Sequence, residues 1–426
     1  MKKIHVYTSA ACNYIPKVRM LAESVRRWHP EWVMHLALSD ELPEGIDLSA
    51  EPFDEVHPAA ALGIPDFQGW AFCHSIVELS TAIKPFVLQR LLDREDCAGV
   101  IFLDPDTVLF SRIDEVPRVL EASNIALTPH LTLPEETLDA VMDNEISSLK
   151  HGVYNLGFLA VAPTPMGKAF AEWWGQRMYH FCRADIPNGL FTDQRWIDLV
   201  PAFFEGVCIL RTPRLNVAPW NLTQRSLSGS APDAVAVDGE PLGFYHFTGF
   251  DSGAHRTMVR RNAPGNPTVD ALVDWYDAAT QALGKDPLAR VAWRFGRYAD
   301  GTAISAAARL VYRERLDLQK AFADPFASTA SSGFRGWWET QGRIEYPELF
   351  APAQAQVVAA MDRLRQALTP GFRAGAGAPR WDAKLVSGHL RQAMGDAEHR
   401  RKLTRRAWEI LRTEGLAGVR RRLARH

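Results

Sequence analysis

A chain of 426 residues, 47% hydrophobic and 23% charged, has the composition of a soluble globular protein with two or three domains. Its 48 basic and 50 acidic side chains nearly balance, which excludes the strongly basic character of a nucleic-acid-binding protein. Five cysteines without CxxC spacing argue against a disulfide framework or a zinc site. The sequence shows neither a signal-peptide pattern nor an apolar run long enough for a membrane helix, so we expect a cytoplasmic protein.

The first hundred residues alternate strand and helix patterns. Residues 3–8 (KIHVYT) predict a strand, residues 18–28 repeat apolar side chains at helical spacing, and residues 32–40 (WVMHLALSD) predict a second strand. A further helical row is bent or restarted at Pro85, and residues 99–104 (GVIFLD) follow as a strand. This alternation indicates an α/β sheet of parallel strands with helices on both faces. Ligands of such sheets bind at the carboxyl ends of the strands.

Two acids follow the strand in VIFLDPDTVLF. On an extended chain Asp104 and Asp106 point to the same side, and two converging carboxylates suit Mg²⁺ or Mn²⁺. The alternative is structural, because Asp-Pro-Asp-Thr is also a good turn sequence in which Asp106 acts as a cap. Both interpretations stay open on these residues alone.

Two later segments add polar residues beside apolar ones. In HGVYNLGFLAVAP a short strand is expected after Asn155 and Gly157, and the glycine allows close approach of another group. In FTDQRWIDLVP, Asp193 and Gln194 precede an apolar helical row. The structural alternatives are a turn residue for Asn155 and a helix N-cap for Asp193.

A histidine follows among aromatic residues in GFYHFTGF, where His246 precedes Gly249 by three positions. Its structural alternative is a core histidine. Taken in order, IHVYTSA, LDPD, YNLGF, FTDQ and HFTG resemble the motifs of GT-A glycosyltransferases that use nucleotide sugars, especially glycosyltransferase family 8. The resemblance covers about residues 1–255, and its specificity comes from five motifs in order rather than from any one of them.

The resemblance implies a GT-A fold, which is a Rossmann-like mixed sheet with helices on both faces, and it favours a retaining sugar transfer. An inverting transfer stays open, because Asp193 could serve either scheme. Asp104, Asp106 and His246 would bind Mn²⁺ or Mg²⁺, which bridges the two phosphates of the donor. The other implied roles are donor binding by Tyr7, Thr8, Lys84 and Gly249, and the sugar and acceptor side for Asn155, Asp193 and Gln194. For Lys84 a solvated helix charge is the alternative.

The sequence departs from the family at one place. The Lys-Pro-Trp that follows His-x-x-Gly in family members is replaced by FDSGAHR. The candidates to replace the diphosphate contact that is lost with it are Arg256 and Arg260.

The rest of the chain is predicted to be helical. We expect a catalytic domain over residues 1–260, and a helical accessory region over residues 261–370 that packs on it and helps to form the acceptor side. A Gly/Ala/Pro linker and a basic helical tail would follow over residues 371–426. The tail predicts a peripheral contact with an anionic membrane, with a plain linker or a partner-binding segment as the alternative.

These expectations together describe a cytoplasmic glycosyltransferase at the inner face of a membrane, acting in bacterial surface glycan synthesis. Its acceptor would be a glycan, a lipid-linked molecule or a protein, and not a nucleic acid. Two other functions stay open: a nucleotidyltransferase, although YTSAACNYIPK lacks the Gly-rich basic loop of that class, and a non-catalytic binding protein on a transferase fold.

Overall fold

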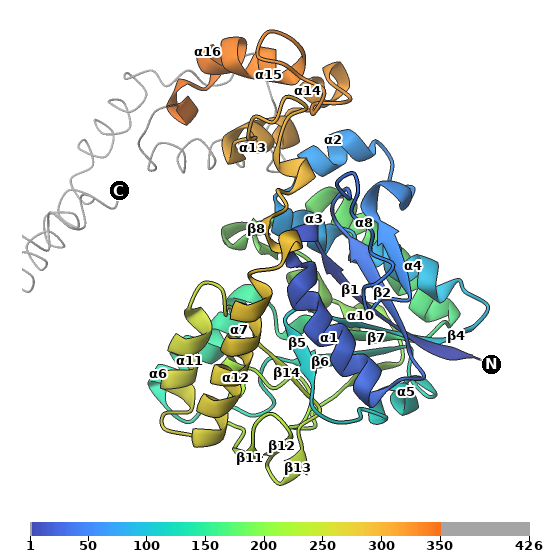
Figure 1. Cartoon of the computed structure of the whole chain (residues 1–426). Coiled ribbons are helices and arrows are strands. Elements are labelled where there is room, and N and C mark those ends of the chain that lie inside the picture. Colours follow the sequence, from blue (N-terminus) through green and yellow to red (C-terminus); the bar gives the residue numbers. More distant parts are fainter. Residues whose placement is uncertain (1, 351–426) are drawn as a thin grey trace, which may run out of the picture. The chain divides into compact units, whose positions relative to one another are not determined.

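A computed structural model describes residues 2–350 (Figure 1). Its centre is a seven-stranded sheet in the order β10-β6-β7-β4-β1-β2-β3. The strands are β1 (Lys3–Ala10), β2 (Val33–Leu38), β3 (Glu55–Pro58), β4 (Cys97–Leu103), β6 (Ile125–Pro129), β7 (Tyr154–Val161) and β10 (Val207–Ile209). β7 runs antiparallel to β4 and β6, and all other neighbours are parallel. The predicted mixed α/β sheet is confirmed, and the wholly parallel sheet suggested by the alternation is corrected at β7.

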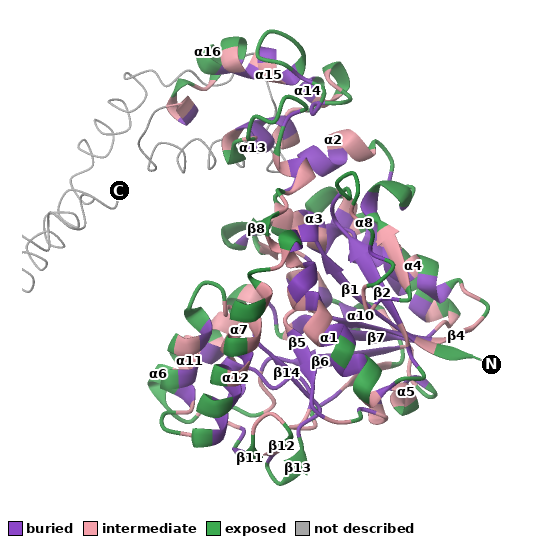
Figure 2. Cartoon of the chain, in the orientation of Figure 1, coloured by how far each residue is buried: buried purple, intermediate pink, exposed green. Residues whose placement is uncertain are grey.

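Helices cover both faces of this sheet; its five inner strands are almost wholly buried, and the edge strands β3 and β10 are partly exposed (Figure 2). On one face α1 (Ile15–Trp28) packs Val18 and Leu21 into one core with Val6 of β1. Successive residues of a strand point to opposite faces, so Tyr7 points the other way. There its hydroxyl donates a hydrogen bond of 3.2 Å to the Lys84 carbonyl of α4 (Lys84–Leu92), against which α8 (Pro165–Phe181) packs.

The predicted helix break at Pro85 is confirmed. α3 (Ile76–Ala82) begins at a capping box between Ser75 and Glu78, and α4 restarts at Lys84 with Pro85 in its first turn, where no amide donor is needed. The restart leaves Lys84 at the junction of two helices.

Two strand boundaries differ from the sequence prediction. β4 ends at Leu103, so strand alternation does not orient the acid pair; a turn closed by a hydrogen bond of 3.0 Å from Thr107 N to the Asp104 carbonyl does. β7 begins at Tyr154, so Asn155 and Gly157 lie inside the strand rather than before it. Pairing with β4 and β6 on both sides extends this strand.

The remaining elements are short. The strands are β5 (Thr107–Leu109), β8 (Ala184–Asp185), β9 (Leu190–Phe191), β11 (Leu227–Ser230), β12 (Ala234–Val237), β13 (Glu240–Pro241) and β14 (Phe244–His246). The helices of the first 250 residues are α2 (Phe67–Phe72), α5 (Glu115–Leu120), α6 (Leu138–Ala140), α7 (Ile146–His151), α9 (Gln194–Ile197) and α10 (Val200–Phe203).

Beyond β14 the described residues form helices and turns. The helices are α11 (Ala254–Asn262), α12 (Pro267–Leu283), α13 (Ala306–Glu314), α14 (Leu316–Ala321), α15 (Gly333–Trp337) and α16 (Arg343–Glu345). Tyr276 of α12 stacks on Phe247 at 3.8 Å, and Arg309 of α13 donates to the carbonyls of Phe72 and His74. This part of the predicted accessory region therefore packs on the first 250 residues.

The predicted linker and basic tail lie outside the described residues. Within residues 2–350, each helix is too short or too polar to cross a membrane.

Candidate active site

A cavity of about 1040 Å³ opens at the carboxyl ends of β1 and β4. Its walls come from the residues that follow these two strands, the α3–α4 junction, the segment around α7, and α11. This is the edge of a parallel α/β sheet where ligands are expected to bind.

The three predicted metal ligands meet on one wall of this cavity. β14 pairs with β5 so that His246 lies opposite Thr107, which follows directly on the acid pair. His246 Nε2 lies 3.0 Å from Asp106 Oδ1 and 3.6 Å from Asp104 Oδ2. Ligand atoms of all three residues lie within 4.8 Å of one another. The Asp-Pro-Asp-Thr turn and the convergence of the carboxylates are thus one arrangement, not two alternatives.

The protonation of His246 follows from its neighbour. Its Nδ1 lies 3.3 Å from Asn155 Oδ1, which also accepts from Gly157 N and Asn216 Nδ2 at 3.1 Å each. An oxygen with two donors already assigned is an acceptor, so His246 Nδ1 carries the hydrogen and donates to it. The other nitrogen, Nε2, therefore faces the two carboxylates.

A cation fits between these three groups. Burial lowers the pKa of His246, but the carboxylates of Asp106 and Asp104 together outweigh burial and raise it. A bare imidazole lone pair beside two carboxylates is unfavourable, so the cluster favours either a proton on Nε2 or a metal ion. Two carboxylates and one imidazole are ligands that Mn²⁺ and Mg²⁺ accept.

Asn155 and Gln194 line the cavity, and their side chains form hydrogen bonds with other groups of the protein. Asn155 Nδ2 donates to His130 Nε2 and to Gln194 Oε1, both at 3.2 Å. Gln194 Oε1 also accepts from Leu156 N at 3.0 Å, and its Nε2 donates to the His151 carbonyl at 3.0 Å. The two amides thus fix the orientation of His246 relative to β7.

Lys84 is buried, so the interpretation as a solvated charge is wrong. Its Nζ lies 3.3 Å from Asp104 Oδ1, 3.1 Å from Asp193 Oδ2 and 4.2 Å from the centre of the Phe102 ring. Burial lowers the pKa of Lys84, but the carboxylates of Asp104 and Asp193 outweigh it and raise the pKa. The ammonium therefore links the acid pair to Asp193.

Asp193 occupies the N-cap position of α9, yet its side chain makes no capping hydrogen bond. It turns instead to Lys84, and the preceding Thr192 adopts a left-handed φ of 45°, which is unusual for a β-branched residue. The backbone here is strained in a way that a simple helix start does not require.

We expect Lys84→Met to lower the free energy of unfolding by about 3 kcal/mol, because it leaves carboxylates buried without their counter-charge. Adding Asp193→Asn should restore part of this loss, which urea unfolding of both single variants and the double variant would measure. The control is Lys168→Met, since the exposed ion pair of Lys168 with Asp93 should contribute little. Strictly additive losses would show that Lys84 and Asp193 are not coupled.

Three predicted donor-binding residues lie elsewhere. Tyr7 and Thr8 are fully buried and do not line the cavity, because β1 continues to Ala10 and its cavity end lies at Ser9 to Ala11. Gly249 also stays outside the lining; its carbonyl accepts from Ser252 Oγ and His255 N ahead of α11, while neighbouring Thr248 faces the cavity.

The two arginines predicted to contact the diphosphate do not line the cavity either. Arg256 pairs with Asp274 and Asp277 of α12, and Arg260 is exposed outside the lining. Arg261 lines the cavity instead, on the same helix face as Met258, and pairs there with Asp143, which also lines the cavity. The spacing of three residues between Met258 and Arg261 places both on this face.

Sequence reasoning missed the residues around His246. Trp220 meets its ring edge-on at 5.4 Å and donates from Nε1 to the His130 carbonyl at 3.1 Å. Asn216 bridges Thr128 Oγ1 and Asn155 Oδ1. These residues come from loops without a motif, and only their contacts in the fold reveal them.

No family model matches the sequence. The chain is similar to two uncharacterised proteins of Bacillus subtilis (strain 168): YfnF, at 30% identity over 176 residues, and YfnD, at 26% identity over 176 residues. These matches cover 41% of this chain, with 57% of YfnF and 54% of YfnD. The chain therefore spans little more than half the length of these curated relatives.

The solved structures to which the chain is similar include glycosyltransferases. One is the galactosyltransferase LgtC in complex with donor and acceptor sugar analogues, at 17% identity and a TM-score of 0.37, covering 67% of this chain and 97% of that one. Another is the bifunctional glycosyltransferase WbbM, at 14% identity and a TM-score of 0.35, covering 67% of this chain and 50% of that one. A third is mouse xyloside xylosyltransferase 1, at 14% identity and a TM-score of 0.33, covering 58% of this chain and 98% of that one.

Proposed function

We propose that this chain is a metal-dependent glycosyltransferase that moves a sugar from a nucleoside diphosphate sugar, in the first place a UDP-sugar, to an acceptor hydroxyl. The observation that carries this proposal is the convergence of Asp104, Asp106 and His246 beside the Lys84–Asp193 ion pair. A cavity of about 1040 Å³ is at the upper end of small-molecule sites and has room for a nucleotide sugar.

Asp104, Asp106 and His246 would hold Mn²⁺ or Mg²⁺. Bound there, the ion neutralises negative charge on the leaving diphosphate. The chain's own contribution is preorganisation: Asn155 accepts from His246 Nδ1 and so keeps Nε2 turned to the carboxylates. Gln194 in turn holds Asn155, which makes both amides positioning residues for the ligand set.

Lys84 and Asp193 lie on the same wall as the acid pair. The buried ammonium keeps the Asp193 carboxylate in a fixed position, where it would meet the sugar or the acceptor hydroxyl. We assign the nucleotide to the end of β1 at Ser9–Ala11 and propose Arg261 for the diphosphate, both from the cavity lining. A retaining outcome is what the family 8 resemblance implies for this site.

The acceptor side is assigned to the segment around α7. Asn144, Ser147 and His151 of this segment line the cavity, and amide, hydroxyl and imidazole groups bind sugars through hydrogen bonds. A glycan, lipid-linked or protein acceptor in bacterial surface glycan synthesis, used at the cytoplasmic face of the membrane, fits this assignment.

Thermal unfolding with UDP and Mn²⁺, each alone and then together, tests the proposal. We expect the two together to raise the melting temperature by more than the sum of their separate effects, because each would bind the native state better in the presence of the other. Indifference to both would favour a non-catalytic binding protein. Stabilisation by nucleoside triphosphates, with release of pyrophosphate, would favour a nucleotidyltransferase. Hydrolysis of a panel of nucleotide sugars would then identify the donor.

A further inference from the structure

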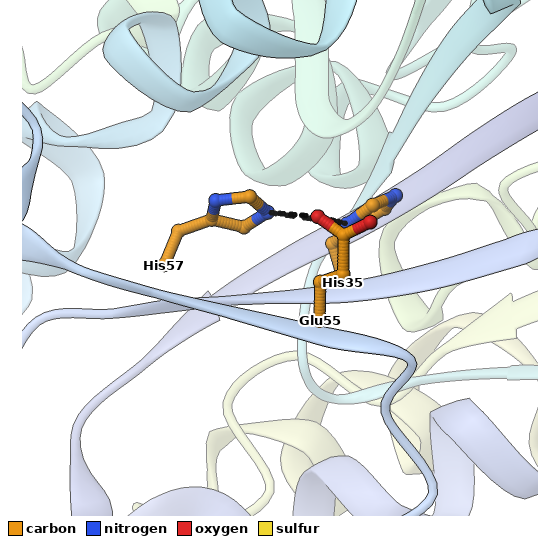
Figure 3. Close-up of side chains that lie close together, drawn as sticks. All are labelled: His35, Glu55 and His57. Carbon is orange, nitrogen blue, oxygen red and sulfur yellow. Dashed lines mark hydrogen bonds and ion pairs between the residues drawn. The ribbon is translucent and has the colours of Figure 1, made fainter. Parts of the chain in front are cut away.

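Three histidines form a line across the strands β1, β2 and β3, away from the cavity. His5 Nδ1 lies 2.9 Å from His35 Nε2, and His35 Nδ1 lies 3.1 Å from His57 Nε2. Glu55 also faces this line, and Figure 3 shows its carboxylate beside the His35 ring, on the side that His57 faces. Such a row of imidazoles has no part in the site described above.

Strand register explains why these side chains meet. His5 pairs with Val33, and His35 stands two residues further along β2; His35 pairs with Glu55, and His57 stands two residues further along β3. Steps of two keep all four side chains on one face of the sheet. His5 and His35 lie toward the amino ends of β1 and β2, whereas the cavity lies at the carboxyl ends of β1 and β4.

The charge at the inner end of the line favours one set of tautomers. The Asp96 carboxylate lies 3.4 Å from His5 Nε2, an electrostatic contact that favours a hydrogen on Nε2 and leaves Nδ1 as an acceptor. His35 Nε2 then donates to His5, and the lone pair of His35 Nδ1 points toward His57 and Glu55. Metal-binding histidines usually have their second nitrogen anchored in this way.

We propose that His35 Nδ1, His57 Nε2 and Glu55 Oε2 bind a divalent transition-metal ion of the Zn²⁺ class. The three atoms are separated by 3.1, 3.8 and 4.0 Å. The point equidistant from the corners of a triangle with these sides lies about 2.1 Å from each, which is the length of Zn–N and Zn–O bonds.

The surroundings agree with this assignment. Burial lowers the pKa of His35 to about 3, so its imidazole is neutral at physiological pH, as a ligand must be. His57 and Glu55 are partly exposed, so an ion can enter from solvent and a water can complete the coordination. Arg94 Nη1 lies 2.9 Å from Glu55 Oε1 and 3.0 Å from Oε2 and holds the carboxylate in place, as hydrogen-bond partners of ligating carboxylates do.

A second histidine cluster in the described part of the chain serves as a contrast. His29, Glu31 and Asp114 also lie within reach of one another. There, however, Arg112 contacts Glu31 at 2.6 Å and Asp114 at 2.9 Å, and His29 Nε2 already accepts from Ile113 N. Arg112 thus neutralises both acids of that cluster, and His29 Nε2 is occupied by Ile113, whereas Arg94 contacts only Glu55 among the three proposed ligands.

The metal would join edge strand β3 to β2, which stabilises an otherwise singly paired strand. Two imidazoles and one carboxylate favour Zn²⁺ or Co²⁺ over Mg²⁺, which prefers oxygen ligands. The lack of CxxC spacing argues only against a zinc site made of cysteines, because it carries no information on histidines that lie in separate strands.

The test uses the full chain with Asp104→Asn and Asp106→Asn, so that the cavity ligands no longer compete. Calorimetric titration with Zn²⁺ should show one tight site, and Co²⁺ should give visible ligand-field bands. His57→Ala or Glu55→Gln in this background should weaken Zn²⁺ binding at least about tenfold. His180→Ala, which removes an exposed histidine elsewhere, should leave the affinity unchanged.

Circular dichroism would verify that each variant folds, and Glu55→Gln supplies the test if His57→Ala does not. Absence of a tight Zn²⁺ site in the background protein would overturn the proposal. The same conclusion would follow if a folded His57→Ala or Glu55→Gln variant bound Zn²⁺ as tightly as its parent.

Discussion

Asp106→Asn should reduce sugar transfer at least about a thousandfold, because a ligated metal ion stabilises the transition state by several kcal/mol. The substitution keeps the shape of the side chain but removes the charge that faces His246 Nε2. The backbone should not change, since the Asp106 carbonyl still accepts from Phe247 N at 2.8 Å. Initial rates with an identified nucleotide-sugar donor, and Mn²⁺-dependent binding of UDP, would measure the loss.

The matched control is Asp93→Asn, an exposed aspartate at the end of α4 whose partner is Lys168. It should retain full activity and UDP binding. We expect both variants to melt within a few degrees of the natural protein, because removing one of two adjacent carboxylates also relieves their repulsion. An active Asp106→Asn variant would mean that the acid pair is a turn without a catalytic role.

Gly157→Ala should abolish Mn²⁺-dependent UDP binding. A Cβ at this position would lie 2.5 Å from His246 Nδ1 and 2.7 Å from Asn155 Oδ1, closer than side-chain atoms approach one another. Gly157 does not have a positive φ, so space alone excludes a larger residue. His246 must move, and the hydrogen bond that fixes its Nε2 is lost with it. Overpacking of this kind also costs about 1–3 kcal/mol of stability.

Gly99→Ala is the matched control, since Gly99 lies within β4 and is also crowded. Its Cβ would meet Leu120 Cδ1 at 2.7 Å and Ile4 Cδ1 at 3.3 Å, which are the ends of flexible side chains remote from the cavity. Stability should fall while UDP binding persists at temperatures below melting. Equal loss of binding in both folded variants would show that crowding of the sheet, and not contact with His246, is responsible.

Much of the fold follows from local patterns. The strand at residues 3–8, the helix after it, and the helix restart at Pro85 depend on side-chain period and on proline chemistry, which act over a few residues. The position of the acid pair at a strand end was also readable, because a buried apolar run ends abruptly at Asp104. The sequence by itself thus determined the α/β class and most of the polar residues of the candidate site.

The contacts among the polar residues of the candidate site form only when segments distant in sequence pack together. Whether Lys84 is solvated or buried depends on Asp193, which is distant in sequence and reaches it from the start of α9. The tautomer of His246 depends on Asn155, and the crowding at Gly157 depends on both. The line of histidines exists because strand register places His5, His35 and His57 diagonally across three strands. Pairings between distant segments have no local signature, because the energy that selects them arises only when the strands pack.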